Sequence, residues 1–206
     1  MKARPLVIVL AAGRGSRFVS GGHKLEQELE GVSLLARTLR SAIASHLPVL
    51  VVTTQLLERQ ARHFVAARDV IVLPEAAPSS GLGMGASIAA GIGARPDAPG
   101  WLLLPADMPL VQPATIASVA QALDQHPIAY AQYQGRRGHP VGFGAELYSE
   151  LVMLSGDHGA RRLIARYPAQ AVDVDDAGVL VDVDTEEDLI ALQAGHTRNR
   201  STAHPK

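Results

Sequence analysis

The chain has 206 residues and a formal net charge of -1, which argues against the basic surface typical of nucleic-acid-binding proteins. It contains no cysteine, so disulfides, thiolate metal sites and cysteine nucleophiles are excluded. No apolar stretch is long enough to cross a bilayer, and the first apolar run ends at Ala12. These features predict a soluble cytoplasmic protein without a membrane or nucleic-acid partner.

The first predicted strand and the loop after it are the most informative segment. An apolar run rich in β-branched residues at 6–11 leads into Gly13 and Gly15, and three cations lie nearby: Arg14, Arg17 and Lys24. A glycine turn after a strand exposes backbone N–H groups, and such groups beside cations suit a triphosphate. The alternative is a plain connection from a strand to a helix.

The spacing within this loop does not fit the two common glycine-rich phosphate motifs. A Walker-type loop has four residues between its glycines and then Lys-Ser or Lys-Thr, whereas one residue separates Gly13 from Gly15 and Leu25 follows Lys24. The dinucleotide-binding fingerprint needs a third glycine where this chain has Phe18. The loop therefore predicts a nucleotide site of another kind.

Strands and helices alternate along the chain after this loop. Helix-period segments are predicted at residues 33–45, 56–67 and 85–94, and buried strands at residues 49–53, 70–73 and 101–104. Repeated β-α order predicts an α/β fold with a mostly parallel sheet and helices on both faces.

The last part of the chain predicts two more helices and a tail. One helix begins at Pro113 and runs to about Leu123. The other is capped by Thr185, which would accept a hydrogen bond from the N–H three residues on, and runs to about Ala194. Residues 1–195 then form a single domain, and residues 196–206 have almost nothing to bury and are expected to be disordered.

Two carboxylate motifs fall where predicted strands end. Asp107 follows the strand at 101–104, and Asp182 and Asp184 alternate with valines, so both would point to one face of a strand. Magnesium takes one or two carboxylates, water and substrate phosphate oxygens. These aspartates therefore predict a magnesium site, with manganese as an alternative ion, against a triphosphate. The other interpretations are a turn cap at Asp107 and a half-solvated strand at 181–184.

Five motifs in order resemble one family. They are LAAGRGSR at 10–17 with Lys24, DMP at 107–109, QGRRGHP at 134–140, SGDHGAR at 155–161 and DVDTEED at 182–188. Over about residues 5–193 the chain resembles the MobA/MocA-like nucleotidyltransferases, and within them the molybdenum cofactor cytidylyltransferases most of all.

The resemblance implies a fold, a reaction and partners. The fold is a three-layer Rossmann-like arrangement of the glycosyltransferase-A type. The reaction transfers the cytidylyl group of CTP to molybdopterin cofactor, with magnesium, and releases pyrophosphate and molybdopterin cytosine dinucleotide. The acceptor phosphate is already anionic, so neither a covalent intermediate nor a general base is expected. A client molybdoenzyme of the xanthine dehydrogenase type is an implied partner.

The resemblance also assigns roles to residues of this chain. The catalytic residues would be Arg17, Lys24 and Asp107, and the metal ligands Asp107, Asp182 and Asp184. The nucleotide would meet Lys24 and the residues Leu10, Ala11, Ala12, Gly13, Arg14, Gly15, Gly83, Ser87 and Met108. The acceptor would meet Arg137, His139, Pro140, Asp157 and Arg161.

Two family marks, Ala12 and Met108, go with CTP, whereas the guanylyl branch has a second glycine in the first motif. One departure is Ala106, where the family usually has glycine before the metal-binding aspartate. A related enzyme that uses GTP or another acceptor, and a non-catalytic cofactor-binding chaperone, are the alternatives left open.

Overall fold

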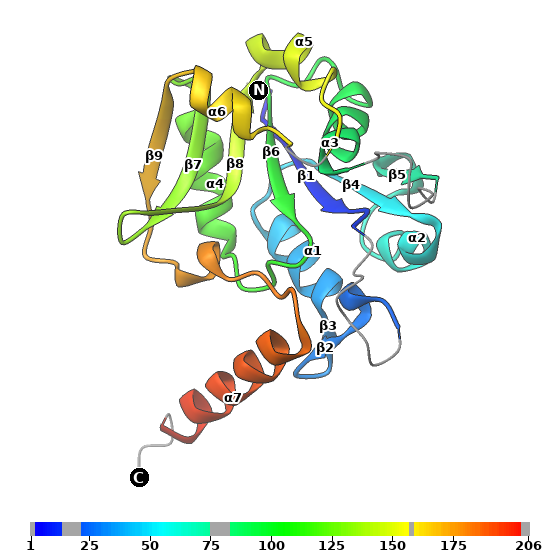
Figure 1. Cartoon of the computed structure of the whole chain (residues 1–206), viewed down its shortest axis with the longest axis vertical. Helices are drawn as coiled ribbons and strands as arrows, with labels where there is room; N and C mark the ends of the chain where they lie inside the picture. Colours follow the sequence, from blue (N-terminus) through cyan, green and yellow to red (C-terminus); the bar gives the residue numbers. More distant parts are fainter. Residues whose placement is uncertain (1–2, 14–21, 75–82, 157–158, 203–206) are drawn as a thin grey trace.

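A seven-stranded sheet forms the centre of the computed structural model, which describes residues 3–13, 22–74, 83–156 and 159–202 (Figure 1). Its strands are β1 (Leu6–Ala11), β4 (Val49–Thr54), β5 (Val70–Leu73), β6 (Gly100–Pro105), β7 (Ile128–Tyr133), β8 (Arg136–Gly144) and β9 (Ala169–Asp173). They lie in the order β5-β4-β1-β6-β8-β7-β9. Only β8 pairs antiparallel to its neighbours, β6 and β7, so the sheet is mostly parallel, as predicted.

Helices cover both faces of this sheet. The α-helices are α1 (Leu34–Ala44), α2 (Gln55–Ala61), α3 (Met84–Gly93), α4 (Pro113–Ala122), α5 (Tyr148–Leu151), α6 (Arg161–Arg166) and α7 (Glu186–Thr202). Four short 3-10 turns, η1 (Lys24–Glu26), η2 (Ala67–Asp69), η3 (Ala145–Leu147) and η4 (Ala177–Leu180), and a hairpin of β2 (Glu28–Leu29) with β3 (Val32–Ser33) complete the described elements. The three-layer α/β fold is thus confirmed.

Two hydrophobic clusters fill the space between the sheet and its helices. Alternate residues of β1 belong to different clusters, Val7 and Val9 to one and Leu6 and Ile8 to the other. The first cluster includes apolar residues of α1, α2 and α4, and the second those of α3, α5 and α6. A strand buried on both faces reads as a continuous apolar run, which is why β1, β4 and β6 were recognisable in the sequence.

Strands β7, β8 and β9 have no counterpart among the predicted strands. β8 carries two arginines, a histidine and three glycines, so its sequence lacks an apolar run. Conversely, residues 181–184 were expected to form a strand, and this prediction is wrong, because they lie in an irregular segment after η4. Their side-chain alternation persists, with Val183 fully buried and Asp182 exposed.

Two helices end elsewhere than predicted. α2 stops at Ala61 rather than residue 67, because Phe64 and Val65 pack against the core from the turn that follows it. α7 continues to Thr202, beyond Ala194, into the tail expected to be disordered. Once a capped helix has begun, each further residue needs only one more backbone hydrogen bond, so a polar segment can extend it. α7 projects from the body of the molecule (Figure 1).

The strand order reverses between β1 and β6. β1 lies between the parallel strands β4 and β6, and the backbone N–H of Ala106 donates to the Leu10 carbonyl at 3.0 Å, just beyond the paired residues. In open α/β sheets, ligands bind beyond the carboxyl ends of strands at such a reversal. The glycine loop after β1 and Asp107 after β6 both begin there.

The segment before Asp182 is anchored by a buried carboxylate. Asp176 is 3% exposed, and its side chain accepts hydrogen bonds from Gln112 N–H at 2.8 Å, Thr115 Oγ1 at 2.7 Å and Gly178 N–H at 3.0 Å. These bonds join η4 to the start of α4. The chain therefore leaves η4 at a defined place next to the end of β6.

We predict opposite effects from the same substitution at two glycines of α3. A Cβ at Gly91 would lie 2.8 Å from Ile8 Cγ2, whereas a Cβ at Gly93 meets nothing within 4 Å. Gly91→Ala should lower the free energy of unfolding by about 1–3 kcal/mol through overpacking against β1. Gly93→Ala should leave it unchanged or raise it by up to about 1 kcal/mol, because alanine favours helix. Thermal and urea unfolding of both variants check this, and equal destabilisation would contradict the close packing of α3 on β1.

Candidate active site

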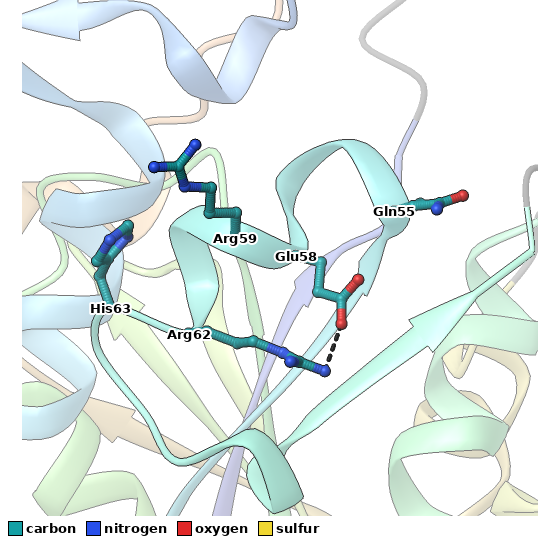
Figure 2. A pocket seen from close by; sticks show the side chains of 5 residues that line it. All are labelled: Gln55, Glu58, Arg59, Arg62 and His63. Atoms are coloured by element: carbon teal, nitrogen blue, oxygen red, sulfur yellow. Dashed lines mark ion pairs between the residues drawn. The ribbon is translucent and has the colours of Figure 1, made fainter.

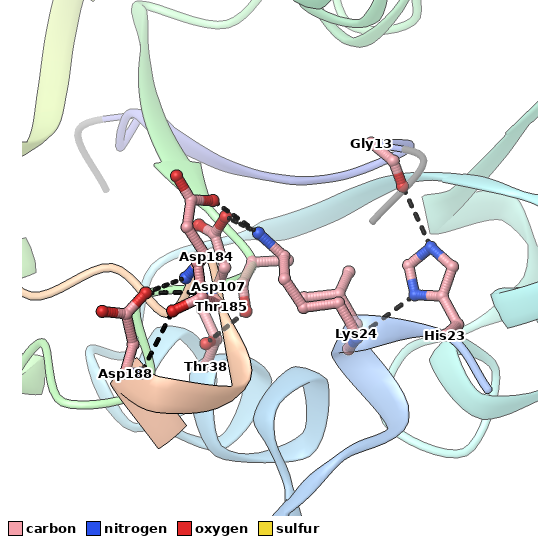
Figure 3. A network of polar contacts seen from close by, with 10 residues as sticks. Gly13, His23, Lys24, Thr38, Asp107, Asp184, Thr185 and Asp188 are labelled. Atoms are coloured by element: carbon pink, nitrogen blue, oxygen red, sulfur yellow. Dashed lines mark hydrogen bonds and ion pairs between the residues drawn. The ribbon is translucent and has the colours of Figure 1, made fainter. Parts of the chain in front are cut away.

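A lysine bridges two carboxylates at the end of β6. Lys24 Nζ lies 2.7 Å from Asp107 Oδ2 and 2.9 Å from Asp184 Oδ1 (Figure 3). The Lys24 side chain is 11% exposed, and those of Asp107 and Asp184 are 22% and 38% exposed. The Lys24–Asp107 pair is largely shielded from water and is therefore stronger than a typical surface pair, whereas the Lys24–Asp184 pair is more open to screening by water. Three sites predicted from distant parts of the sequence thus meet at one point.

The protonation of Lys24 follows from this arrangement. Burial of the ammonium lowers the pKa of Lys24, but the charge and hydrogen bond of Asp107, followed by those of Asp184, more than offset it and hold that pKa above its usual value. Lys24 is therefore a cation in the ligand-free site.

His23 positions Lys24 at the start of η1. The Leu25 N–H donates to His23 Nδ1 at 3.1 Å, so the other nitrogen, Nε2, carries the proton and donates to the Gly13 carbonyl at 2.9 Å (Figure 3). Glu26 completes the cap by accepting from the His23 N–H at 3.3 Å. No local signal marks His23 as a cap, because histidine is not among the residues preferred at helix starts.

Asp184 is held by the cap of α7. Thr185 Oγ1 accepts from the Asp188 N–H at 3.2 Å, as predicted, and Asp188 Oδ2 accepts from the N–H groups of Asp184 at 3.0 Å and Thr185 at 2.8 Å. The backbone hydrogen bond from Thr185, then its side chain and the Asp184 N–H, hold the pKa of Asp188 below its usual value. Asp188 is thus an ionised positioning residue for Asp184, a role that its place in the first turn of a helix does not reveal in the sequence.

The backbone around Asp107 is fixed from two sides. Val183 N–H donates to the Asp107 carbonyl at 3.0 Å, and Thr38 Oγ1 of α1 donates to the Ala106 carbonyl at 2.9 Å. Ala106 itself is 1% exposed and is absent from the described residues with positive φ. Alanine in place of the family glycine therefore adds no backbone strain here.

A pocket of about 580 Å³ opens over this centre. Its charged lining combines three carboxylates with four cations: Asp107, Asp182 and Asp184 with Lys24, Arg136, Arg137 and Arg161. Met84, Met108, Pro105, Gly138, His139, Val179 and Leu180 complete the lining. The hairpin between β7 and β8 supplies Arg136 and Arg137, and the Arg137 guanidinium lies over the Tyr130 ring at 5.7 Å from its centroid.

The structure brings only part of the predicted site into this pocket. Lys24, Asp107, Asp182, Asp184, Met108, Arg137, His139 and Arg161 line it. Gly83, Ser87 and Pro140 do not, although Met84, which follows Gly83 at the start of α3, does. Arg14, Gly15, Arg17 and Asp157 lie outside the described residues.

The residues at the end of β1 carry few side-chain groups that a ligand could contact. The Ala11 side chain is fully buried, and the Leu10 carbonyl already accepts from Ala106. Ala12 is half-buried, and Gly13 is exposed with room for a Cβ. Met108 is 3% exposed, so it packs in the core while its edge reaches the pocket.

His139 faces the pocket as a neutral ring. Burial lowers the pKa of His139 below its usual value, against the opposing effects of a hydrogen bond with the Leu103 backbone and the charges of Asp107 and Asp182. Within the described part of the chain, its Nδ1 is buried and has no hydrogen-bond partner. A neutral imidazole beside arginines adds a polar contact without adding positive charge.

The carboxylates fit a hard cation but do not enclose one. Oxygens of Asp107 and Asp184 converge on a single ammonium, which shows that both can reach one cation. Among the described residues, no three carboxylate, histidine or cysteine side chains group closely enough to hold a metal. Such a pair suits an ion that takes its other ligands from water and substrate phosphates.

Another hollow lies on the outer surface of α2. It has a volume of about 500 Å³ and is lined by Gln55, Glu58, Arg59, Arg62 and His63 (Figure 2). Arg62 pairs with Glu58 there, and none of the predicted site residues takes part.

In the described part of the chain, no helix is both long and apolar enough to span a membrane.

Known proteins share this sequence and fold. The purine catabolism protein PucB of Bacillus subtilis (strain 168) is 28% identical over 198 residues, which cover 88% of this chain and 92% of PucB. A crystal structure of an Rv0371c homologue from Mycobacterium sp. strain JC1 has a TM-score of 0.81 at 27% identity, covering 97% of this chain and all of that one. Rv0371c of Mycobacterium tuberculosis H37Rv, solved in complex with manganese, has a TM-score of 0.76 at 26% identity, covering 93% and 98%.

The family follows from the same comparison. Residues 7–172 match the MobA-like NTP transferase domain, a span that begins in β1, ends in β9 and so includes residues of every strand of the central sheet. The match contains the glycine loop, Lys24 and Asp107, while Asp184 lies just beyond it. This chain belongs to the MobA-like NTP transferase domain family, and it is a nucleotidyltransferase by that membership.

Proposed function

We propose that this nucleotidyltransferase is a molybdenum cofactor cytidylyltransferase, which joins the cytidylyl group of CTP to molybdopterin cofactor and releases pyrophosphate. The observation that carries the proposal is the convergence of Asp107 and Asp184 on one cation at the strand-order reversal, next to the glycine loop. A triphosphate needs cations and backbone N–H groups at the same place. The loop after β1, with Lys24, would supply both.

The donor side of the pocket would hold CTP. Backbone groups from Leu10 to Gly15 would meet base and ribose, and Arg14, Arg17 and Lys24 would neutralise the triphosphate. Asp107 and Asp184, with Asp182 nearby, would hold magnesium or manganese, which supplies charge neutralisation at the phosphates. A relative that is 26% identical has been solved with manganese, which supports a divalent cation.

The acceptor side would be formed by β8 and α6. Arg136, Arg137 and Arg161 line the same pocket as the carboxylates, and arginine is the side chain best suited to a phosphate group. Neutral His139 lines the same pocket, and the charges of Asp107, Asp182 and Arg137 act on it. An acceptor phosphate held there would attack the α-phosphorus in line, and positioning with charge neutralisation would account for the rate.

The choice of base rests on two residues, and the choice of client enzyme rests on a relative. Ala12 and Met108 are the residues that go with CTP in the family resemblance, and both are at least partly buried at the end of β1 and β6. The Bacillus subtilis relative is a purine catabolism protein. A client of the xanthine dehydrogenase type, which oxidises purines, fits that relative.

The test is turnover of each nucleotide. Purified protein is incubated with magnesium, molybdopterin cofactor and CTP, GTP, ATP or UTP, and pyrophosphate and the dinucleotide product are measured. Pyrophosphate from CTP alone supports the proposal. Turnover with GTP or another acceptor points to a related enzyme, and binding of the cofactor without turnover points to a chaperone.

Replacing Asp107 should abolish most activity without unfolding the protein. Asp107→Asn removes one charge of the pair that faces Lys24, and the loss of one transition-state electrostatic contact costs about two to three orders of magnitude in kcat. Asp97→Asn is the matched control, because Asp97 is exposed and does not line the pocket. Steady-state kinetics and circular dichroism check both, and wild-type turnover in Asp107→Asn would disprove the metal assignment.

Removing a cation from the glycine loop should weaken the use of nucleotide. Lys24→Ala and Arg17→Ala should each raise the KM for CTP and slow transfer, because each change removes one positive charge that would neutralise the triphosphate. Arg59→Ala, on the remote hollow of α2, is the control for loss of a positive charge. Initial rates across CTP concentrations provide the measurement. Unchanged kinetics in both variants would mean that these cations do not bind the triphosphate and that the loop only connects a strand to the next element.

Base preference should depend on Ala12 and Met108. CTP should exceed GTP in kcat/KM, because a site built around one base leaves buried polar groups unpaired with another, at a cost of roughly several kcal/mol. Ala12→Gly with Met108→Ala should reduce this preference before it reduces magnesium dependence, since neither side chain bonds the carboxylates. Met108→Leu controls for core packing, because it roughly conserves volume. Equal use of CTP and GTP by the wild type would refute the cytidylyl assignment alone.

A further inference from the structure

The Lys24 ammonium occupies the place at which the two carboxylates meet. Its distances of 2.7 Å to Asp107 and 2.9 Å to Asp184 are hydrogen-bond lengths, so the ammonium bonds the same two side chains that the proposed function gives to a divalent cation. Two cations cannot share those oxygens without strong repulsion at such distances.

We propose that Lys24 is a resident counter-cation, and that its displacement couples metal binding to triphosphate binding. The inference rests on the proposed function and names the role of one residue within it. Without ligand, Lys24 balances one of the two negative charges. When a metal ion takes the carboxylates, the ammonium has to leave them.

The surroundings determine where the released ammonium finds a new partner. Among the described residues, the other charged groups of the pocket are Arg136, Arg137 and Arg161, which repel the ammonium, and Asp182, which is exposed. The side chain is also largely buried, so an unpaired ammonium would be costly there. A triphosphate bound next to the glycine loop would provide the new partner. Its oxygens would accept hydrogen bonds from the ammonium and neutralise its charge as the metal binds the carboxylates.

The rearrangement needs only side-chain motion. The backbone of η1 is held by His23, which bonds both Leu25 and Gly13, and by Glu26. Lysine has a flexible four-carbon stem and a compact ammonium that can exchange partners. Asp184 stays in place, because the N–H groups of Asp184 and Thr185 both donate to Asp188.

The coupling has a measurable consequence. Competition from Lys24 weakens metal binding to the nucleotide-free protein, and a triphosphate removes that competition. By linkage, the metal strengthens nucleotide binding by the same factor. Direct contact between metal and phosphates adds to this coupling, so a variant without the ammonium is needed to separate the two contributions.

The experiment titrates the protein with Mn²⁺ and follows free Mn²⁺ by electron paramagnetic resonance, with and without CTP and with no acceptor present. Lys24→Met, which keeps the stem and removes the charge, should bind Mn²⁺ about tenfold more tightly than wild type without CTP, within the usual range of coupling between sites. Arg136→Met removes a cation that lines the same pocket without bonding either carboxylate, and should change this affinity much less.

A second measurement uses the wild type, so it does not depend on the folding of a variant. The chain has only three lysines, and the other two are Lys2 and Lys206 near its ends. In protein labelled with ¹³C-lysine, the Lys24 Cε signal should shift on titration with Mg²⁺ and shift again on addition of CTP. The signals of Lys2 and Lys206 serve as internal references.

The outcomes separate this inference from the proposed function. The counter-cation role is overturned if Lys24→Met binds Mn²⁺ no more tightly than wild type, or if the Lys24 Cε signal does not shift when Mg²⁺ is added. The nucleotidyltransferase assignment stands in both cases. If wild type binds no Mn²⁺ even with nucleoside triphosphates, the proposed metal site itself fails. If Arg136→Met raises the Mn²⁺ affinity as much as Lys24→Met does, the effect comes from the net charge of the pocket, and the inference is also overturned.

Discussion

The site depends on two carboxylates that share one cation. Asp107 and Asp184 would repel each other at this separation, and the Lys24 ammonium between them makes their approach favourable. Their positions are set by backbone hydrogen bonds, since Val183 donates to the Asp107 carbonyl. Elements from the start, middle and end of the domain therefore meet at this charge cluster, and the sheet provides the frame that holds them there.

The fold places this cluster through its strand order. β1 and β6 are central parallel neighbours, so the loops that leave their carboxyl ends begin side by side. On the other side of β6, the antiparallel strand β8 brings arginines of the β7–β8 hairpin to the same edge. Carboxylates and guanidinium groups thus line one pocket.

Small residues permit the close packing beneath this pocket. A Cβ at Gly138 would clash with the Val179 carbonyl oxygen, and one at Gly178 would clash with that of Leu110. These contacts let η4 lie directly on β8 and on the segment after β6. Asp176 ties the same turn to α4, so the chain enters the segment of Asp182 and Asp184 from a rigid base.

The sequence by itself determined the elements whose signals are local. The apolar runs of β1, β4, β5 and β6 and the cap at Thr185 were readable, because burial on both faces and capping depend on neighbours in the chain. Tertiary structure alone decided that Lys24 bonds Asp107 and Asp184, which lie 83 and 160 residues away along the chain. It also decided that polar, glycine-rich β8 is a strand and that 181–184 is not, because both depend on pairing with distant partners, which no local pattern records.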